Sequence, residues 1–171
     1  MKQKIFKDYP NPVFIETGCY AGDGIKCALE AGFERIISIE ISPNWFAHCL
    51  DRFKSIDGVE LYLGDSYTVL PVILKTVNDN CTFWLDAHPS AKEKTGVIKV
   101  PVLHEINSII EHMDNNNLMH TILVDDMRCF DKTQGWWGVT KEEIINTLSN
   151  AGFSISYADG HIPNDILIAT L

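Results

Sequence analysis

The stretch NPVFIETGCYAGDGIKCALEAGF, residues 11–33, passes from an apolar run through a glycine-rich turn into an amphipathic segment. The apolar run at 12–17 predicts a strand, and residues 24–32 predict a helix. Glycines at 18, 22 and 24 would let the turn adopt positive φ angles and lie close to a ligand. Ligands of open α/β sheets bind beyond the carboxyl ends of the strands. The turn therefore indicates a nucleotide-like ligand, with a simple tight turn as the alternative.

The rest of the chain repeats this alternation of strands and helices. Such alternation predicts a parallel sheet with helices on both faces. Two final strands joined by a short connection indicate an antiparallel C-terminal edge strand. We therefore expect residues 1–171 to form a single α/β domain with a mostly parallel, seven-stranded sheet. The further strands are predicted at 35–41, 59–65, 81–87, 120–126, 153–160 and 165–171, and the further helices at 44–55, 66–77, 101–114 and 140–152.

The composition limits the partners that we expect. Lys and Arg number 14 against 23 Asp and Glu, which gives a net charge of −9, and no basic run is present. Nucleic acid is therefore a disfavoured partner. No apolar run approaches the roughly 18–20 residues that span a membrane, and the first ten residues lack the apolar core of a secretory signal. The five scattered cysteines form no C-x-x-C pair, which indicates reduced thiols and a cytoplasmic location.

The glycine-rich turn differs from two common phosphate-binding patterns. Read from Gly22, the pattern G-x-G-x-x-G fails because Cys27 takes the place of the third glycine, and G-K-[ST] is absent. The turn does fit acid-x-Gly-x-x-x-Gly, with Glu16, Gly18 and Gly22. Glu40 ends the second strand, where a carboxylate can accept hydrogen bonds from ribose hydroxyls.

Carboxylates also end the fourth and fifth strands. Asp86 follows the run FWL, and Asp125 and Asp126 follow the run ILV. At one sheet edge these groups would repel one another unless a cation neutralised them. Carboxylate oxygens suit Mg²⁺, with Ca²⁺ or Mn²⁺ as other choices. The alternatives are helix capping and a turn in which Arg128 pairs with the acids.

The acid–glycine pattern and the acidic strand ends resemble the class I S-adenosylmethionine-dependent methyltransferases, and the resemblance covers residues 12–171. It implies a Rossmann-like, doubly wound fold in which the glycine turn approaches the methionine and ribose of S-adenosylmethionine. Tyr20 stands where a glycine is commoner, and Asp65 would bind the adenine amino group with help from Ser66. The residues that the resemblance implies for cofactor binding are Glu16, Gly18, Tyr20, Gly22, Glu40, Asp65, Ser66 and Asp86.

The acids after the fourth and fifth strands are similar to those of the macrocin-type, metal-dependent sugar O-methyltransferases. That resemblance implies that Asp86, Asp125 and Asp126 bind a divalent metal and that Asp86 takes part in catalysis. His88 stands where those enzymes carry a second acid, which acts as a general base. An imidazole, with an ordinary pKa of about 6.5, suits proton removal near neutrality. A role of His88 as a metal ligand, or as an ordinary loop residue, stays open.

The expected function is methyl transfer from S-adenosylmethionine to a hydroxyl of a small molecule or sugar, assisted by Mg²⁺ or another divalent cation. Trp136 and Trp137, beyond the fifth strand, could stack on the acceptor or close the crevice. A homodimer is a further expectation, because few residues precede the first strand to cover the site. Two alternatives stay open: a non-catalytic, cofactor-binding relative that acts as an interaction module, and a metal-dependent hydrolase that uses the same aspartates.

Overall fold

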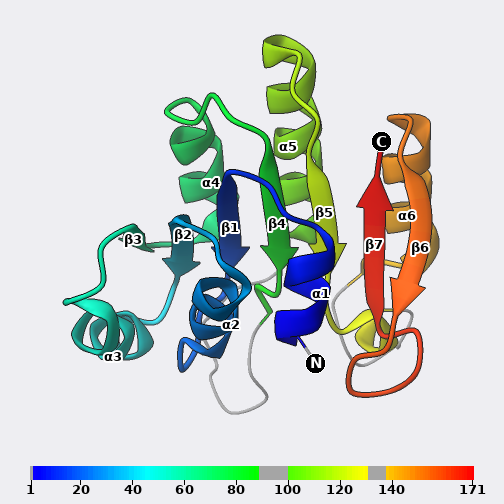
Figure 1. Cartoon of the computed structure of the whole chain (residues 1–171). Helices are drawn as coiled ribbons and strands as arrows, with labels where there is room; N and C mark the ends of the chain where they lie inside the picture. Colours follow the sequence, from blue (N-terminus) through cyan, green and yellow to red (C-terminus); the bar gives the residue numbers. More distant parts are fainter. Residues whose placement is uncertain (1, 89–99, 131–137) are drawn as a thin grey trace.

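The computed structural model describes residues 2–88, 100–130 and 138–171, and within these ranges seven strands form one sheet. The strand order is β3-β2-β1-β4-β5-β7-β6 (Figure 1). Strands β1 to β5 run parallel to one another, whereas β7 runs antiparallel to both β5 and β6. This confirms the predicted Rossmann-like α/β fold. The strands are β1 (Val13–Thr17), β2 (Arg35–Glu40), β3 (Val59–Leu63), β4 (Cys81–Leu85), β5 (Thr121–Val124), β6 (Ser154–Ala158) and β7 (Ile166–Thr170).

Helices cover both faces of the sheet (Figure 1). Helices α1 (Lys2–Asp8), α2 (Asp23–Ala31) and α3 (Pro43–Phe53) pack on one face. Helices α4 (Ser66–Leu74), α5 (Val102–Asn116) and α6 (Lys141–Asn150) pack on the other face. A short 3₁₀ helix, η1 (Met127–Cys129), follows β5.

The central strands supply apolar side chains to two cores. In β1, Phe14 joins the core under α1 to α3, whereas Val13 and Ile15 join the core under α4 to α6. Successive side chains of a strand point to opposite faces, so a strand that is covered on both faces needs an unbroken apolar run. The same holds for β4, whose residues are all buried.

Helix α1 is absent from the sequence-based prediction, and it matters for the site. The buried Phe6 ring lies 4.7 Å from the ring of Phe14 and 5.0 Å from that of Trp84, measured between centroids. The side-chain amide of Gln3 donates to the carbonyl of Glu30 in α2 at 3.2 Å. These contacts hold the start of the chain near the carboxyl ends of the central strands, as the N label in Figure 1 shows.

Two further predictions can be compared with the fold. Within the described ranges, each helix is too short or too polar to cross a membrane. All five cysteines are free thiols. Trp136 and Trp137 lie outside the described residues.

A buried histidine pair lies at the opposite end of β4. The backbone N–H of Cys81 donates to Nδ1 of His120 at 3.1 Å, so the proton of His120 resides on Nε2. That nitrogen donates to Nδ1 of His112 at 3.0 Å, and Nε2 of His112 donates to the carbonyl of Val77 at 2.9 Å. Each ring nitrogen of His112 and His120 thus takes part in one hydrogen bond. Burial, together with the neighbouring His112, lowers the pKa of His120 to about 4.

Protonation of His120 should therefore cost the folded chain stability in mild acid. The folded-state pKa of His120, about 4, lies below its ordinary value of 6.5, so this contribution is complete above pH 6.5 and is lost as pH falls toward 4. Its size should be roughly 2–3 kcal/mol. Urea unfolding at pH 7 and pH 4.5 measures it, with His120→Asn as the comparison. If wild type and His120→Asn lose the same free energy of unfolding between pH 7 and pH 4.5, the lowered pKa is not that of His120.

Candidate functional site

A cleft of about 530 Å³ lies at the carboxyl ends of the parallel strands. It brings together side chains that follow β1, β2, β3, β4 and β5, as predicted for one shared sheet edge. Two predicted residues, Glu16 and Gly22, do not line it. The predicted residues that do line it are Gly18, Tyr20, Glu40, Asp65, Ser66, Asp86, His88, Asp125 and Asp126.

The turn after β1 requires a glycine and is held by a carboxylate. Gly18 has a φ of 81°, and a Cβ there would lie 2.7 Å from the carbonyl oxygen of Asp86. Tyr20 also has a positive φ, 46°, which is uncommon for a residue with a side chain. Its backbone N–H donates to Oε2 of Glu40 at 2.8 Å. The Tyr20 ring contacts Trp45 of α3, with 4.1 Å between centroids, so two aromatic side chains form one wall of the cleft.

Glu40 and Asp65 use part of their hydrogen-bonding capacity to shape the cleft. Besides Tyr20, Glu40 accepts the backbone N–H of Ser42 through Oε1 at 2.8 Å. Asp65 is the N-cap of α4 and accepts the N–H of Tyr67 at 3.0 Å. Because a carboxylate oxygen has two acceptor sites, each group can still bind a ligand hydroxyl or amine.

Glu16 lies beneath the glycine turn. Its carboxylate accepts the hydroxyl of Ser38 at 2.7 Å, and a Cβ at Gly24 would lie 1.7 Å from its Oε1. The side chain is 2% exposed, and burial raises its pKa to about 8. Gly22 packs against Phe53 and Cys49. This placement gives both residues a role in shaping the turn, while direct contact with a cofactor stays a prediction.

Replacement of Glu16 by glutamine should reduce the pH dependence of stability. The folded-state pKa of about 8 lies above the ordinary 4.5, so a proton binds Glu16 more tightly in the folded chain, and the contribution of Glu16 to stability falls as pH rises from 4.5 to 8. Glu16→Gln keeps an acceptor for Ser38. Relative to wild type, its free energy of unfolding should be higher at pH 8 than at pH 5 by roughly 2–4 kcal/mol. Unfolding curves at both pH values test this, with exposed Glu34→Gln as control. If Glu16→Gln changes the free energy of unfolding equally at pH 5 and pH 8, the pKa of Glu16 is not raised.

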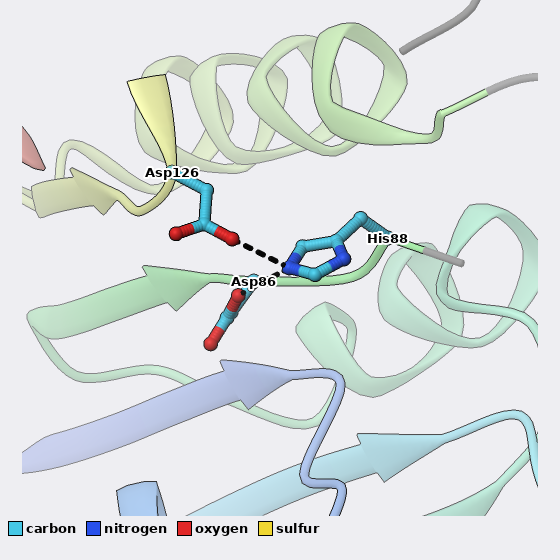
Figure 2. Close-up of side chains that lie close together, drawn as sticks. All are labelled: Asp86, His88 and Asp126. Carbon is cyan, nitrogen blue, oxygen red and sulfur yellow. Dashed lines mark ion pairs between the residues drawn. The ribbon is translucent and has the colours of Figure 1, made fainter. Parts of the chain in front are cut away.

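Acidic side chains form one cluster with three cationic ones. Nζ of Lys2 lies 3.1 Å from Oδ2 of Asp86 and 3.0 Å from Oδ2 of Asp125. Nε2 of His88 lies 3.1 Å from Asp86 and 2.9 Å from Asp126, as Figure 2 shows.

The third cation of the cluster is Arg128. Its Nη1 contacts both Asp126 and the fully buried Asp165. Asp165 also accepts the backbone N–H groups of Arg128 at 2.9 Å and His161 at 3.0 Å. The sequence-based alternative, a turn in which Arg128 pairs with the acids, is thus present in the structure.

The cluster shifts the protonation of its members. Burial alone would lower the pKa values of Lys2 and His88, but the adjacent carboxylates outweigh it. The pKa of Lys2 rises above its ordinary value, and that of His88 rises to about 9. Burial, with repulsion from Asp86, raises the pKa of Asp125. At neutral pH His88 is therefore mostly an imidazolium, which must lose its proton before it can act as the predicted base.

The donor set can be tested against a divalent cation. Ligand atoms of Asp86, His88 and Asp126 lie within 4.8 Å of one another, as do those of Asp125, Asp126 and Asp165. Neither set contains all three predicted metal ligands. The oxygen and imidazole donors suit Mg²⁺ or Mn²⁺. However, each of these four carboxylates already contacts Lys2, His88 or Arg128, so three cationic side chains offset most of their charge without a metal.

Sequence reasoning missed two residues that line the cleft and one buried acid outside its lining. Lys2 lies in the unpredicted helix α1, and Trp45 resembles any apolar residue of an amphipathic helix. Glu105 of α5 is 1% exposed and has a pKa raised to about 7, mainly by burial and against the influence of Ser66 and Thr17. A charge within the apolar face of α5 is the one signal that could have identified Glu105.

The strand order, with β7 antiparallel between β5 and β6, is that of the class I S-adenosylmethionine-dependent methyltransferases. No family model and no curated protein matches the sequence.

Solved structures of that class resemble this chain at low sequence identity. Cofactor-bound Rv0187 from MTB superposes with a TM-score of 0.67 at 16% identity, over 99% of this chain and 77% of that one. An SAH-bound methyltransferase from Podospora anserina gives 0.62 at 13% identity, over 99% and 75%. An O-methyltransferase from Bacillus cereus in complex with SAH gives 0.61 at 11% identity, over 99% and 79%. At these identities the likeness shows the fold alone.

Proposed function

We propose that this protein transfers a methyl group from S-adenosylmethionine to a hydroxyl group of a small molecule, such as a sugar. The observation that supports this most is the composition of the cleft. One side offers Tyr20, Glu40 and Asp65 to a nucleoside, and the other offers a cluster of acids and cations to an acceptor. Two of the similar solved structures contain SAH, and one of them is an O-methyltransferase.

The nucleoside side of the cleft fits S-adenosylmethionine in size and chemistry. The volume of the whole cleft, about 530 Å³, lies in the usual range for small-ligand sites. The apolar side chains of Ile39 and Ile41 and the ring of Trp45 can contact the adenine faces. Glu40 can accept hydrogen bonds from the ribose hydroxyls, and Asp65 can accept one from the adenine amino group.

The acceptor side must orient a hydroxyl and remove its proton. Transfer forms a C–O bond as the C–S bond of the sulfonium breaks, and S-adenosylhomocysteine leaves. No covalent enzyme intermediate is needed, so positioning and proton removal are the contributions of the protein. His88 must first release its Nε2 proton to solvent, and the lone pair of Nε2, which lies 3.1 Å from Asp86 and 2.9 Å from Asp126, then accepts the hydroxyl proton.

The predicted Mg²⁺, or another divalent cation, would be held by Asp86, His88 and Asp126, the set whose ligand atoms lie close together in the cleft. When bound, such an ion lowers the pKa of an acceptor hydroxyl. The cationic side chains already present can balance the same carboxylates, so the proton transfer to His88 does not depend on the ion.

A screen of hydroxylated acceptors with a labelled methyl donor tests the proposal. Label transferred to a sugar or other hydroxyl compound supports it. Binding of the cofactor without transfer to any acceptor favours the interaction module, and hydrolysis of an ester without methyl transfer favours the hydrolase.

A further inference from the structure

Lys2 occupies the position between two of the predicted metal ligands. Its Nζ bridges Oδ2 of Asp86 and Oδ2 of Asp125 at 3.1 and 3.0 Å. The same Nζ lies 4.6 Å from the centroid of the Trp84 ring, a favourable cation–π distance. The Asp125 side chain is 9% exposed, so its carboxylate has little access to water as an alternative partner.

The position of Lys2 is set by the fold and does not depend on a flexible tail. One turn further along α1, Ile5 and Phe6 are buried under the sheet, and Gln3 is hydrogen-bonded to α2. The lysine side chain is 36% exposed and lines the cleft. A cation is thus delivered to the carboxylates by a helix that has its own packing contacts.

We propose that the ammonium group of Lys2 takes the place of a divalent cation between Asp86 and Asp125, so that this cleft works without a metal. An ammonium group has three N–H donors, and the two carboxylates use two of them. The third can bind the oxygen of an acceptor that enters the cleft. The remaining acids, Asp126 and Asp165, have Arg128 as their cation.

The alternative is that Lys2 only fills the site until a metal displaces it. A metal that bound Asp86 would lie next to the ammonium, and the repulsion between the two cations would weaken its binding. Removal of the lysine charge should therefore create a metal site that the wild-type protein lacks. The inference on catalysis rests on the proposed methyl transfer, but the metal-binding part does not.

Titration with Mn²⁺, followed by calorimetry and by the electron paramagnetic resonance of the free ion, tests this. Lys2→Met removes the charge and keeps the apolar chain. Lys2→Arg keeps the charge, and Lys4→Met changes an exposed lysine of the same helix. We expect Lys2→Met to bind Mn²⁺ at least about tenfold more tightly than wild type, Lys2→Arg and Lys4→Met, which should resemble one another.

Two results would overturn the inference: tight binding of Mn²⁺ to wild-type protein, or a folded Lys2→Met variant that binds Mn²⁺ no more tightly than wild type. If Lys2→Met does not fold, the wild-type and Lys2→Arg titrations still test the inference, because tight binding of Mn²⁺ to these two proteins would contradict it. Titration of the same samples with S-adenosylhomocysteine keeps the proposals separate. Its failure to bind would reject the methyltransferase function, whereas tight Mn²⁺ binding to wild type would reject only the role of Lys2.

Discussion

Replacement of Glu40 by alanine is expected to weaken the binding of S-adenosylhomocysteine about a hundredfold, or about 3 kcal/mol. Two losses combine in this variant. The first is the acceptor for the ribose hydroxyls. The second is the anchor of the turn, because Glu40 accepts the N–H groups of both Tyr20 and Ser42 at 2.8 Å. Tyr20 would then be free to leave its positive φ, and its contact with Trp45 would loosen.

Calorimetric titration measures this effect, and two further variants define its origin. Glu40→Gln keeps an acceptor oxygen and should lose only about tenfold in affinity. Glu60→Ala removes a glutamate that pairs with Arg35 on β2, outside the residues that line the cleft, and should bind like wild type. Unchanged affinity in Glu40→Ala would mean that the nucleoside does not occupy this side of the cleft.

Replacement of His88 by asparagine should lower the rate of methyl transfer by about 10²- to 10⁴-fold. Asparagine can still form a hydrogen bond to Asp86 or Asp126, but it cannot accept the hydroxyl proton. Since His88 lies on the acceptor side, affinity for S-adenosylhomocysteine should change by no more than about twofold.

The rate is measured with the acceptor that the labelled-donor screen identifies. His104→Asn is the matched control, because His104 stacks on Tyr67 and is not among the residues that line the cleft. A His88→Asn variant with the wild-type rate would show that another group takes the proton. A loss of cofactor affinity equal to the loss of rate would place His88 in binding.

Much of this fold follows from local sequence signals. Strands β1 and β4 are covered on both faces, and the apolar runs at 13–15 and 83–85 identify them. The helix α6 begins at a capping box formed by Thr140 and Glu143, which its sequence predicts. The predicted strands 35–41 and 81–87 extend one residue past the end of β2 at Glu40 and two residues past the end of β4 at Leu85, because periodicity cannot tell a strand end from the first residues of a loop.

The location of the cleft also follows from the sequence, but the electrostatics do not. Carboxyl ends of parallel strands meet at one edge, so Glu40, Asp65, Asp86 and Asp125 could be placed together. Repulsion among acids indicated a cation, but sequence spacing does not identify its source. The cation between Asp86 and Asp125 is Lys2 of α1. Lys2 is distant from both acids in the sequence, and only the packing of Phe6 brings it near them.

The burial of Glu16 is a further feature that a motif cannot reveal. In the sequence it is the acid of an acid–glycine pattern, and the prediction gives it a cofactor contact. In the structure Gly24 leaves room for its carboxylate beneath the turn, where it accepts the hydroxyl of Ser38. A motif fixes residue types and spacing, whereas the tertiary packing decides which side chain faces the cleft.

The most direct test of the account is calorimetric titration of the wild-type protein with S-adenosylhomocysteine. We predict saturable binding to one site per chain, with a dissociation constant of about 100 μM or tighter. Absence of saturable binding at millimolar ligand would contradict the central claim, that the cleft between Tyr20 and Asp126 holds the adenosyl cofactor.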